Sequence, residues 1–115
     1  MSFYRVQANT FPVADILQAE NQRSISWNTG EDVRHGISAC ESREELATYL
    51  AQVGIHFSDS WVLVEFDGDY AAEEDEDAHL GAVLTIPERI ISTEIVGDAF
   101  GMEIMDAYEA LLQAA

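Results

Sequence analysis

The chain contains no lysine, one cysteine and two prolines. Its five basic residues are all arginines and stand against 22 acidic residues, which gives a formal net charge of −17. So negative a field repels nucleic acid and anionic membranes, and it speeds encounter with cationic proteins. We therefore expect a basic protein partner, with no direct binding to nucleic acid or membrane. An acidic, lysine-free composition is also typical of salt-adapted or highly soluble proteins, and this alternative stays open.

The scarcity of cysteine and of long apolar runs excludes several further classes of protein. Cys40 is the only cysteine, which excludes an internal disulfide and a thiolate metal cluster. No apolar run reaches the roughly 18 residues of a membrane-spanning helix, and residues 1–11 lack the features of a signal peptide. We expect a soluble, cytoplasmic protein in which Cys40 is a packed thiol.

The length and the apolar content of the chain favour one globular domain over residues 1–115. The chain is 48% hydrophobic, so its charge does not imply disorder. A chain of 115 residues buries roughly two-thirds of the surface that its unfolded form exposes. No internal repeat or interdomain linker is evident.

The first third of the chain predicts a strand, a helix and a loop. Residues 2–8 suit a strand that carries Arg5 on the face opposite Tyr4 and Val6. Pro12 fits a first helical turn, and the apolar spacing after it predicts a helix over 12–23. Residues 24–34 contain turn signals and no sustained period, so a loop anchored by Trp27 is expected.

The clearest local signal follows a short strand predicted over 35–40. Ser42-Arg43-Glu44-Glu45 is a capping box, in which the Ser42 hydroxyl accepts from the Glu45 amide and the Glu45 carboxylate reaches back. The helix that it begins is expected to end at Gly54, a residue that favours the left-handed conformation.

The second half predicts further strands and a last helix. Residues 61–66 are almost continuously apolar, as in a central strand buried on both faces. Residues 82–86 and 89–96 form two strands, or one bent strand broken by Pro87. Asp98 can cap a helix with Phe100, Ile104, Met105, Tyr108, Leu111 and Leu112 on one side and Glu103, Asp106 and Glu109 on another. The order β-α-β-α-β-β-β-α predicts an α+β (mixed α/β) domain around one central sheet.

The polar residues predict no metal site and no hydrolytic triad. His35, His56 and His79 share no helix face by their spacing, so surface or hydrogen-bonded histidines are expected. The stretch DGDYAAEEDED, residues 67–77, holds seven carboxylates but lacks the glycine and glutamate positions of a calcium-binding hand. Ser38, Ser42 and His35 are not accompanied by a G-x-S-x-G elbow.

The order of several short motifs resembles the ADP-ribosyltransferase fold. The motifs are an early strand with Tyr4-Arg5, the strand-to-helix segment 36–50, the strand VLVEFDGD and the segment HLGAVLTIPERIIS. The resemblance implies NAD as cofactor, with Arg5 and Ser42 in the NAD pocket and Cys40, or Ser38 in a shifted register, at the other serine position. Ala82 stands where that family has its catalytic glutamate, so transfer activity is not expected.

The size and charge of the chain are also similar to those of small acidic phage inhibitors of host defence, including anti-CRISPR and anti-restriction proteins. That similarity implies a non-catalytic protein that mimics nucleic acid and docks on a basic, nucleic-acid-binding surface without any cofactor. The carboxylates expected to bind the partner are Asp67, Asp69, Glu73, Glu74, Asp75, Glu76, Asp77, Glu103, Asp106 and Glu109. The alternative is an ADP-ribosyltransferase-like enzyme or pseudoenzyme that binds NAD.

Overall fold

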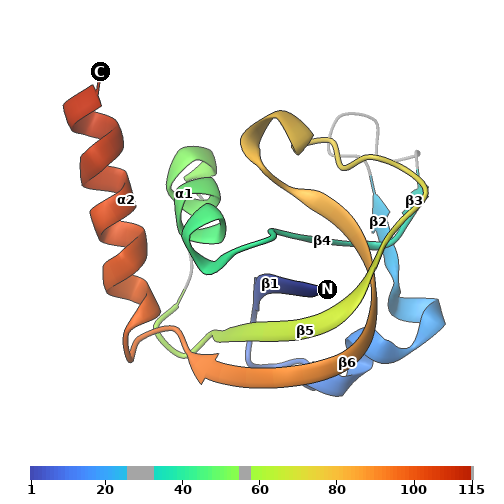
Figure 1. Cartoon of the computed structure of the whole chain (residues 1–115). Coiled ribbons are helices and arrows are strands. Elements are labelled where there is room, and N and C mark those ends of the chain that lie inside the picture. Colours follow the sequence, from blue (N-terminus) through green and yellow to red (C-terminus); the bar gives the residue numbers. More distant parts are fainter. Residues whose placement is uncertain (26–32, 55–57, 115) are drawn as a thin grey trace.

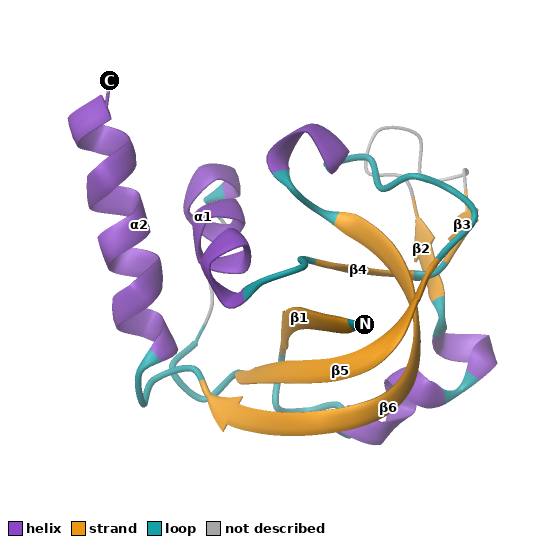
Figure 2. Ribbon diagram, viewed as in Figure 1, coloured by secondary structure: helices purple, strands orange, loops and turns teal. Residues whose placement is uncertain are grey.

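The computed structural model describes residues 1–25, 33–54 and 58–114 and has an α+β fold, which confirms the predicted class (Figure 1). Two α-helices lie side by side at one end of a strongly curved sheet, and two short strands and two 3₁₀ helices lie at the other end (Figure 2). The elements in chain order are β1 (Ser2–Gln7), η1 (Val13–Leu17), η2 (Ala19–Asn21), β2 (Arg23–Ile25), β3 (Val33–His35), β4 (Ile37–Ala39), α1 (Arg43–Val53), β5 (Val62–Tyr70), η3 (Ala78–Leu80), β6 (Val83–Ile95) and α2 (Phe100–Ala114).

The main sheet has four antiparallel strands in the order β1-β5-β6-β4. Tyr4 of β1 and Cys40, directly after β4, form an isolated antiparallel bridge with two backbone hydrogen bonds of 2.9 Å. The bridge joins the two edges, so the sheet closes on itself as a small, incomplete barrel. Strands β2 and β3 form a separate two-stranded ribbon.

Strand β5 is the central strand that its apolar run predicts, and it is buried on both faces. Leu63 packs in the core beneath the helices, whereas Val64 and Phe66 pack in a second core inside the curved sheet. The strand continues to Tyr70, four residues beyond the predicted end. The first four residues of DGDYAAEEDED therefore belong to the sheet and not to a loop, because pairing with β6 extends that far.

Strand β6 is one bent strand, the second of the two predicted alternatives. Pro87 is accommodated because the register shifts beside it: Gly68 faces Pro87 while Asp67 faces Arg89, which leaves Glu88 as an extra residue. At Gly68 a Cβ atom would lie 2.3 Å from the Ile86 carbonyl oxygen, so the close approach of β5 to β6 requires glycine.

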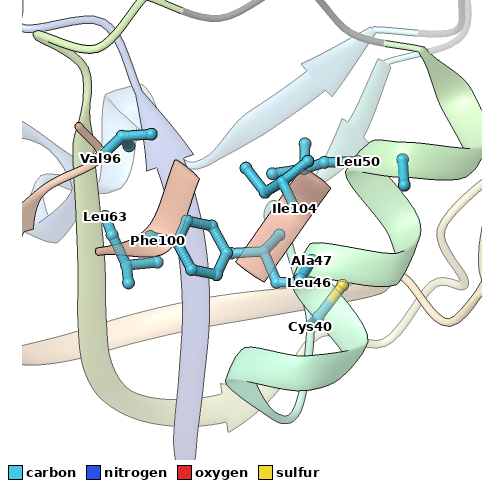
Figure 3. Packing of buried hydrophobic residues seen from close by; sticks show 9 residues of the cluster. Cys40, Leu46, Ala47, Leu50, Leu63, Val96, Phe100 and Ile104 are labelled. Carbon is cyan, nitrogen blue, oxygen red and sulfur yellow. The ribbon is translucent and has the colours of Figure 1, made fainter. Parts of the chain in front are cut away.

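The helices and the sheet enclose the first of two cores (Figure 3). Its buried members are Cys40, Leu46, Ala47, Leu50, Ala51, Leu63, Val96, Phe100 and Ile104. The second core lies against η1 and contains Phe3, Ile16, Ile37, Ala39, Val64 and Phe66. Because Phe3 belongs to the second core while Tyr4 and Val6 pack against the first, β1 separates the two, and Arg5 falls on the Phe3 side as predicted.

Helix α1 begins and ends as predicted. The Ser42 Oγ accepts a hydrogen bond of 3.0 Å from the Glu45 amide, and Gly54 adopts φ 67° at the C-terminal cap. Within the described residues, no hydrogen bond runs from the Ser42 amide to the Glu45 carboxylate, so only one half of the capping box forms. A side-chain cap of this kind contributes about 1 kcal/mol to helix stability.

Three sequence predictions are wrong in detail. The predicted helix over 12–23 is replaced by η1 and η2, because only Ile16 in these two turns is buried and a longer helix would lack an apolar face to pack. Residues 24–34, expected to be a loop, contribute to β2 and β3, while Trp27 lies outside the described residues. The strand expected over 35–40 is split at Gly36, which has a φ of 133°.

Helix α2 follows the predicted residues but buries a narrower face. Phe100 and Ile104 are buried and Leu111 is partly buried, as expected. The three other residues of the predicted apolar side are exposed because α2 packs only against α1 and the sheet; they are Met105, Tyr108 and Leu112. No helix in the described parts of the chain has the length and apolarity needed to cross a membrane.

Candidate functional site

The acidic loop between β5 and β6 is anchored on helix α1. The Tyr49 hydroxyl donates a hydrogen bond of 2.6 Å to Asp77 Oδ2, and Asp75 Oδ1 accepts one of 2.8 Å from the Asp77 amide. Burial, together with the bond to Asp77, raises the pKa of Tyr49. Two of the predicted binding carboxylates, Asp75 and Asp77, therefore hold the loop in place, whereas Glu73 and Glu74 are exposed.

The start of α1 adds three carboxylates that sequence reasoning missed. Glu44 and Glu45 line a shallow hollow together with Leu80 of the loop. Desolvation raises the pKa of Tyr70, and the nearby Glu41 carboxylate raises that pKa by a smaller amount. The sequence signal for these three carboxylates is the run Glu41-Ser42-Arg43-Glu44-Glu45, which the capping of α1 also explains. We call the combined surface the acidic face; its members are Glu41, Glu44, Glu45, Glu73, Glu74, Asp75, Glu76 and Asp77.

The remaining predicted carboxylates do not belong to the acidic face. Asp67 on β5 accepts a bond of 2.5 Å from the N-terminal ammonium group and one of 3.4 Å from Arg89, and the ammonium group holds its pKa below the usual range. Asp69 is exposed near the end of β5. On α2, Glu103 is paired with an arginine, while Asp106 and Glu109 are exposed.

Arg43 forms ion pairs with two carboxylates, Glu94 of β6 and Glu103 of α2. Its Nη2 lies 2.7 Å from Glu94 Oε2 and 2.5 Å from Glu103 Oε2, and its guanidinium stacks over the Phe100 ring at 5.2 Å. Hydrogen bonds to both carboxylates raise the pKa of Arg43. Glu103 is therefore occupied in joining α2 to α1 and β6 and is not an open binding residue.

The other arginines are also placed away from the acidic face, with one exception. Arg89 pairs with Asp67, and Arg5 and Arg23 line a pocket at the other end of the sheet. Arg34 borders the acidic face, where its Nη1 donates to the backbone carbonyl of Glu74. Arg43 stands between Glu41 and Glu44 in the sequence, but its guanidinium pairs with Glu94 and Glu103. The fold thus separates most of its few positive charges from this surface.

The pocket at the other end has a volume of about 370 Å³ and is bounded by β1, η1, η2, β2 and β4. It collects two of the five arginines of the chain. The polar side chains that line it are Arg5, Gln7, Asp15, Asn21, Arg23, Ser24 and Ser38. Sequence reasoning singled out Arg5 and Ser38 but missed Gln7, for which the alternation Phe3-Arg5-Gln7 along β1 was the available signal.

Arg5 is the unusual group of this pocket. Its buried Nε has no hydrogen-bond partner, and no ion pair reaches its guanidinium in the described part of the protein. Burial lowers the pKa of Arg5 to about 10. Arg5 and Ser38 also line a second pocket of about 210 Å³ between β1, β4 and α1, so they lie between the two hollows.

The resemblance to ADP-ribosyltransferases implies that Arg5 and Ser42 share an NAD pocket. Ser42 caps α1 and lines neither pocket, whereas Ser38 lines both. Ala82 is 1% exposed, and its methyl side chain offers no carboxylate at the position of that family's catalytic glutamate.

The remaining candidate residues do not form a metal-binding or catalytic centre within the described parts of the chain. Across residues 1–25, 33–54 and 58–114, no group of three or more histidine, cysteine or acidic side chains is arranged to hold a metal ion. His35 and His79 are exposed, and His56 lies outside the described residues. Cys40 is 1% exposed, which confirms the prediction of a packed thiol.

Comparison of the chain with protein-family models, with curated proteins and with solved structures returns no match. The acidic face and the pocket lined by Arg5 are the two surfaces of the described part of the chain with the features of a binding site.

Proposed function

We propose that this chain is a non-catalytic interaction protein that docks its acidic face on the basic, nucleic-acid-binding surface of a partner protein. One observation supports the proposal above all: carboxylates from the start of α1 and from the loop before β6 share one surface, and most of the arginines lie elsewhere. A surface of this kind attracts a basic groove at long range, and spaced carboxylates can substitute for phosphates.

The anchoring of the loop supports recognition by a preformed surface. The bonds from Tyr49 to Asp77 and from the Asp77 amide to Asp75 fix the middle of the loop. A fixed array of charges loses less conformational freedom on binding than a mobile one. An inhibitor that occupied such a groove would exclude nucleic acid, in the manner expected of anti-CRISPR or anti-restriction proteins.

The proposal is tested by affinity capture from a host lysate at low salt, elution with a salt gradient and identification of the eluted proteins. We expect the immobilised chain to capture nucleic-acid-binding proteins. Adding duplex DNA or RNA to the solution should displace them from it. A triple variant with Glu44→Gln, Glu73→Gln and Glu74→Gln should no longer capture these proteins, because it removes three exposed charges of the acidic face. These carboxylates form no side-chain hydrogen bond or ion pair among the described residues, so we expect the fold to persist.

The matched control removes three exposed carboxylates outside the acidic face through Glu20→Gln, Glu88→Gln and Asp98→Asn. Both variants change the net charge equally, so a general charge effect would weaken capture by both. Loss with the first variant alone supports the acidic face. Equal capture by wild type and the first variant would exclude it as the docking surface.

The second candidate is an ADP-ribosyltransferase-like protein that binds NAD without transferring ADP-ribose. It is favoured by the presence of Arg5 and Ser38 in one pocket, and the buried Ala82 argues against the chemical step. Ligand-detected NMR with NAD tests it: saturable binding that is lost in Arg5→Ala supports the candidate, and no contact at about 1 mM NAD removes it.

A further inference from the structure

An unpartnered cation lies in the pocket of a protein that is otherwise strongly negative. The Arg5 side chain is part of the lining and its Nε is buried. Among the described residues, the guanidinium forms neither a hydrogen bond nor an ion pair. A buried charge without a partner is costly, because desolvation is not offset by any attraction. Asp15 lines the same pocket, but no carboxylate of the described residues forms an ion pair with Arg5, which indicates a position available to an external anion.

A second unsatisfied atom belongs to Gln7, which also lines this pocket. Gln7 is only 7% exposed; its Nε2 donates to the Phe11 carbonyl at 3.3 Å, while its Oε1 has no donor. Because Gln7 and Arg5 are two residues apart on one strand, their side chains lie on the same face of β1. The pocket lining therefore includes a planar cation suited to an oxyanion and a residue, Gln7, whose buried acceptor has no donor among the described residues.

The other charges of the pocket are consistent with an anionic ligand. Arg23 adds a second positive charge and Asp15 one negative charge, and no ion pair joins Asp15 to either arginine among the described residues. A volume of about 370 Å³ is at the small end of ligand pockets, which span roughly 300 to 1,000 Å³. It suits a small molecule better than a dinucleotide.

We propose that the pocket lined by Arg5 and Gln7 binds a small oxyanion, a carboxylate or phosphate, that carries a hydroxyl or amine donor beside the charged group. Arg5 binds the oxyanion through its guanidinium fork, and the Gln7 Oε1 accepts from the donor. Phe11 also lines the pocket and is 65% exposed, so its ring offers an apolar surface for the rest of the ligand. The site is independent of the acidic face.

The test is a titration of ¹⁵N-labelled protein followed by NMR at the Arg5 Nε–H and the Gln7 side-chain amide. The probes are two pairs that differ in one hydroxyl: acetate with glycolate, and methyl phosphate with 2-hydroxyethyl phosphate. We expect shifts at both groups, with a Kd of about 1 mM for the better hydroxylated probe. One additional hydrogen bond predicts binding about 3- to 10-fold tighter than for the matched probe without hydroxyl. The pair that binds more tightly distinguishes carboxylate from phosphate.

Three variants separate the contributions. Arg5→Met should abolish binding of all probes. Gln7→Met should give the two probes of each pair the same Kd. Arg89→Met removes an arginine outside the pocket as the matched control and should leave every Kd unchanged. The wild-type titration is decisive even where a variant folds poorly. No shift at Arg5 with any probe at about 10 mM overturns the proposal. Binding of NAD without binding of the small probes overturns it as well and assigns the pocket to a dinucleotide.

Discussion

At the residue scale, Arg5 lowers the stability of the ligand-free protein. Its pKa of about 10 is below the ordinary value of 12.5, so the folded state releases a proton more readily than the unfolded state does. The penalty is fully present below pH 10 and diminishes as the pH rises through 10, which makes it constant near neutrality. A residue that destabilises the apo protein while facing a pocket is typical of a functional position.

We predict that Arg5→Met raises the free energy of unfolding of the ligand-free protein by about 1 to 3 kcal/mol at pH 7. Urea denaturation followed by fluorescence or circular dichroism measures the change. Arg89→Met serves as the control, because that side chain is 71% exposed and its removal should alter stability by no more than about 0.5 kcal/mol. A clear destabilisation by Arg5→Met would show that Arg5 has favourable native contacts.

Cys40 gives a second prediction at this scale. Burial raises the pKa of its thiol to about 12, with smaller contributions from Glu45, Asp75 and Glu41. From an ordinary value of 9.0, this lowers the thiolate fraction roughly a thousandfold. We expect almost no alkylation by iodoacetamide at pH 8 in the native state and rapid alkylation in urea, measured by mass spectrometry. Rapid labelling without denaturant would contradict the packing of Cys40.

At the element scale, the junction of β5 and β6 depends on Gly68. We predict that Gly68→Ala lowers the free energy of unfolding by about 3 kcal/mol or more, since its Cβ would clash with the Ile86 carbonyl in the backbone of β6. Gly54→Ala is the matched control: it places a methyl group in open space and costs only about 1 to 2 kcal/mol through its positive φ. Thermal or urea denaturation of both variants measures the difference, and equal losses would contradict the close approach of the strands.

At the scale of the whole molecule, the net charge of −17 opposes the compact state. We predict that the Tm rises as NaCl increases from about 0.02 M to about 0.5 M, because screening weakens repulsion within the acidic face. The variant with Glu44→Gln, Glu73→Gln and Glu74→Gln should have a higher Tm at low salt and a smaller rise with salt. Differential scanning calorimetry measures both. A Tm that falls with salt would mean that the ion pairs of Arg43 dominate over the repulsion.

The parts that were predictable from sequence are those with a local cause. The cap at Ser42, the end of α1 at Gly54 and the burial of β5 each follow from interactions within a few residues or from a continuous apolar run. The helix over 12–23 was predicted wrongly because its spacing was adequate but the rest of the fold buries only Ile16 there. Likewise, α2 forms as predicted, whereas the exposure of its apolar residues depends on what packs against it.

The candidate sites also have features that follow from composition and features that follow only from the tertiary structure. Composition alone determined that the molecule is acidic, that its bases are few and that residues 67–77 are dense in carboxylates. Only the tertiary structure decided which carboxylates meet: Asp67 and Glu103 are neutralised by cations distant in sequence, and the start of α1 joins the loop instead. Closure of the sheet by the Tyr4–Cys40 bridge likewise places Arg5 beside Ser38 in a pocket where no described carboxylate forms an ion pair with it. The physical reason is that charge is an additive property of the residues, whereas pairing and desolvation depend on distances that long-range strand pairing sets.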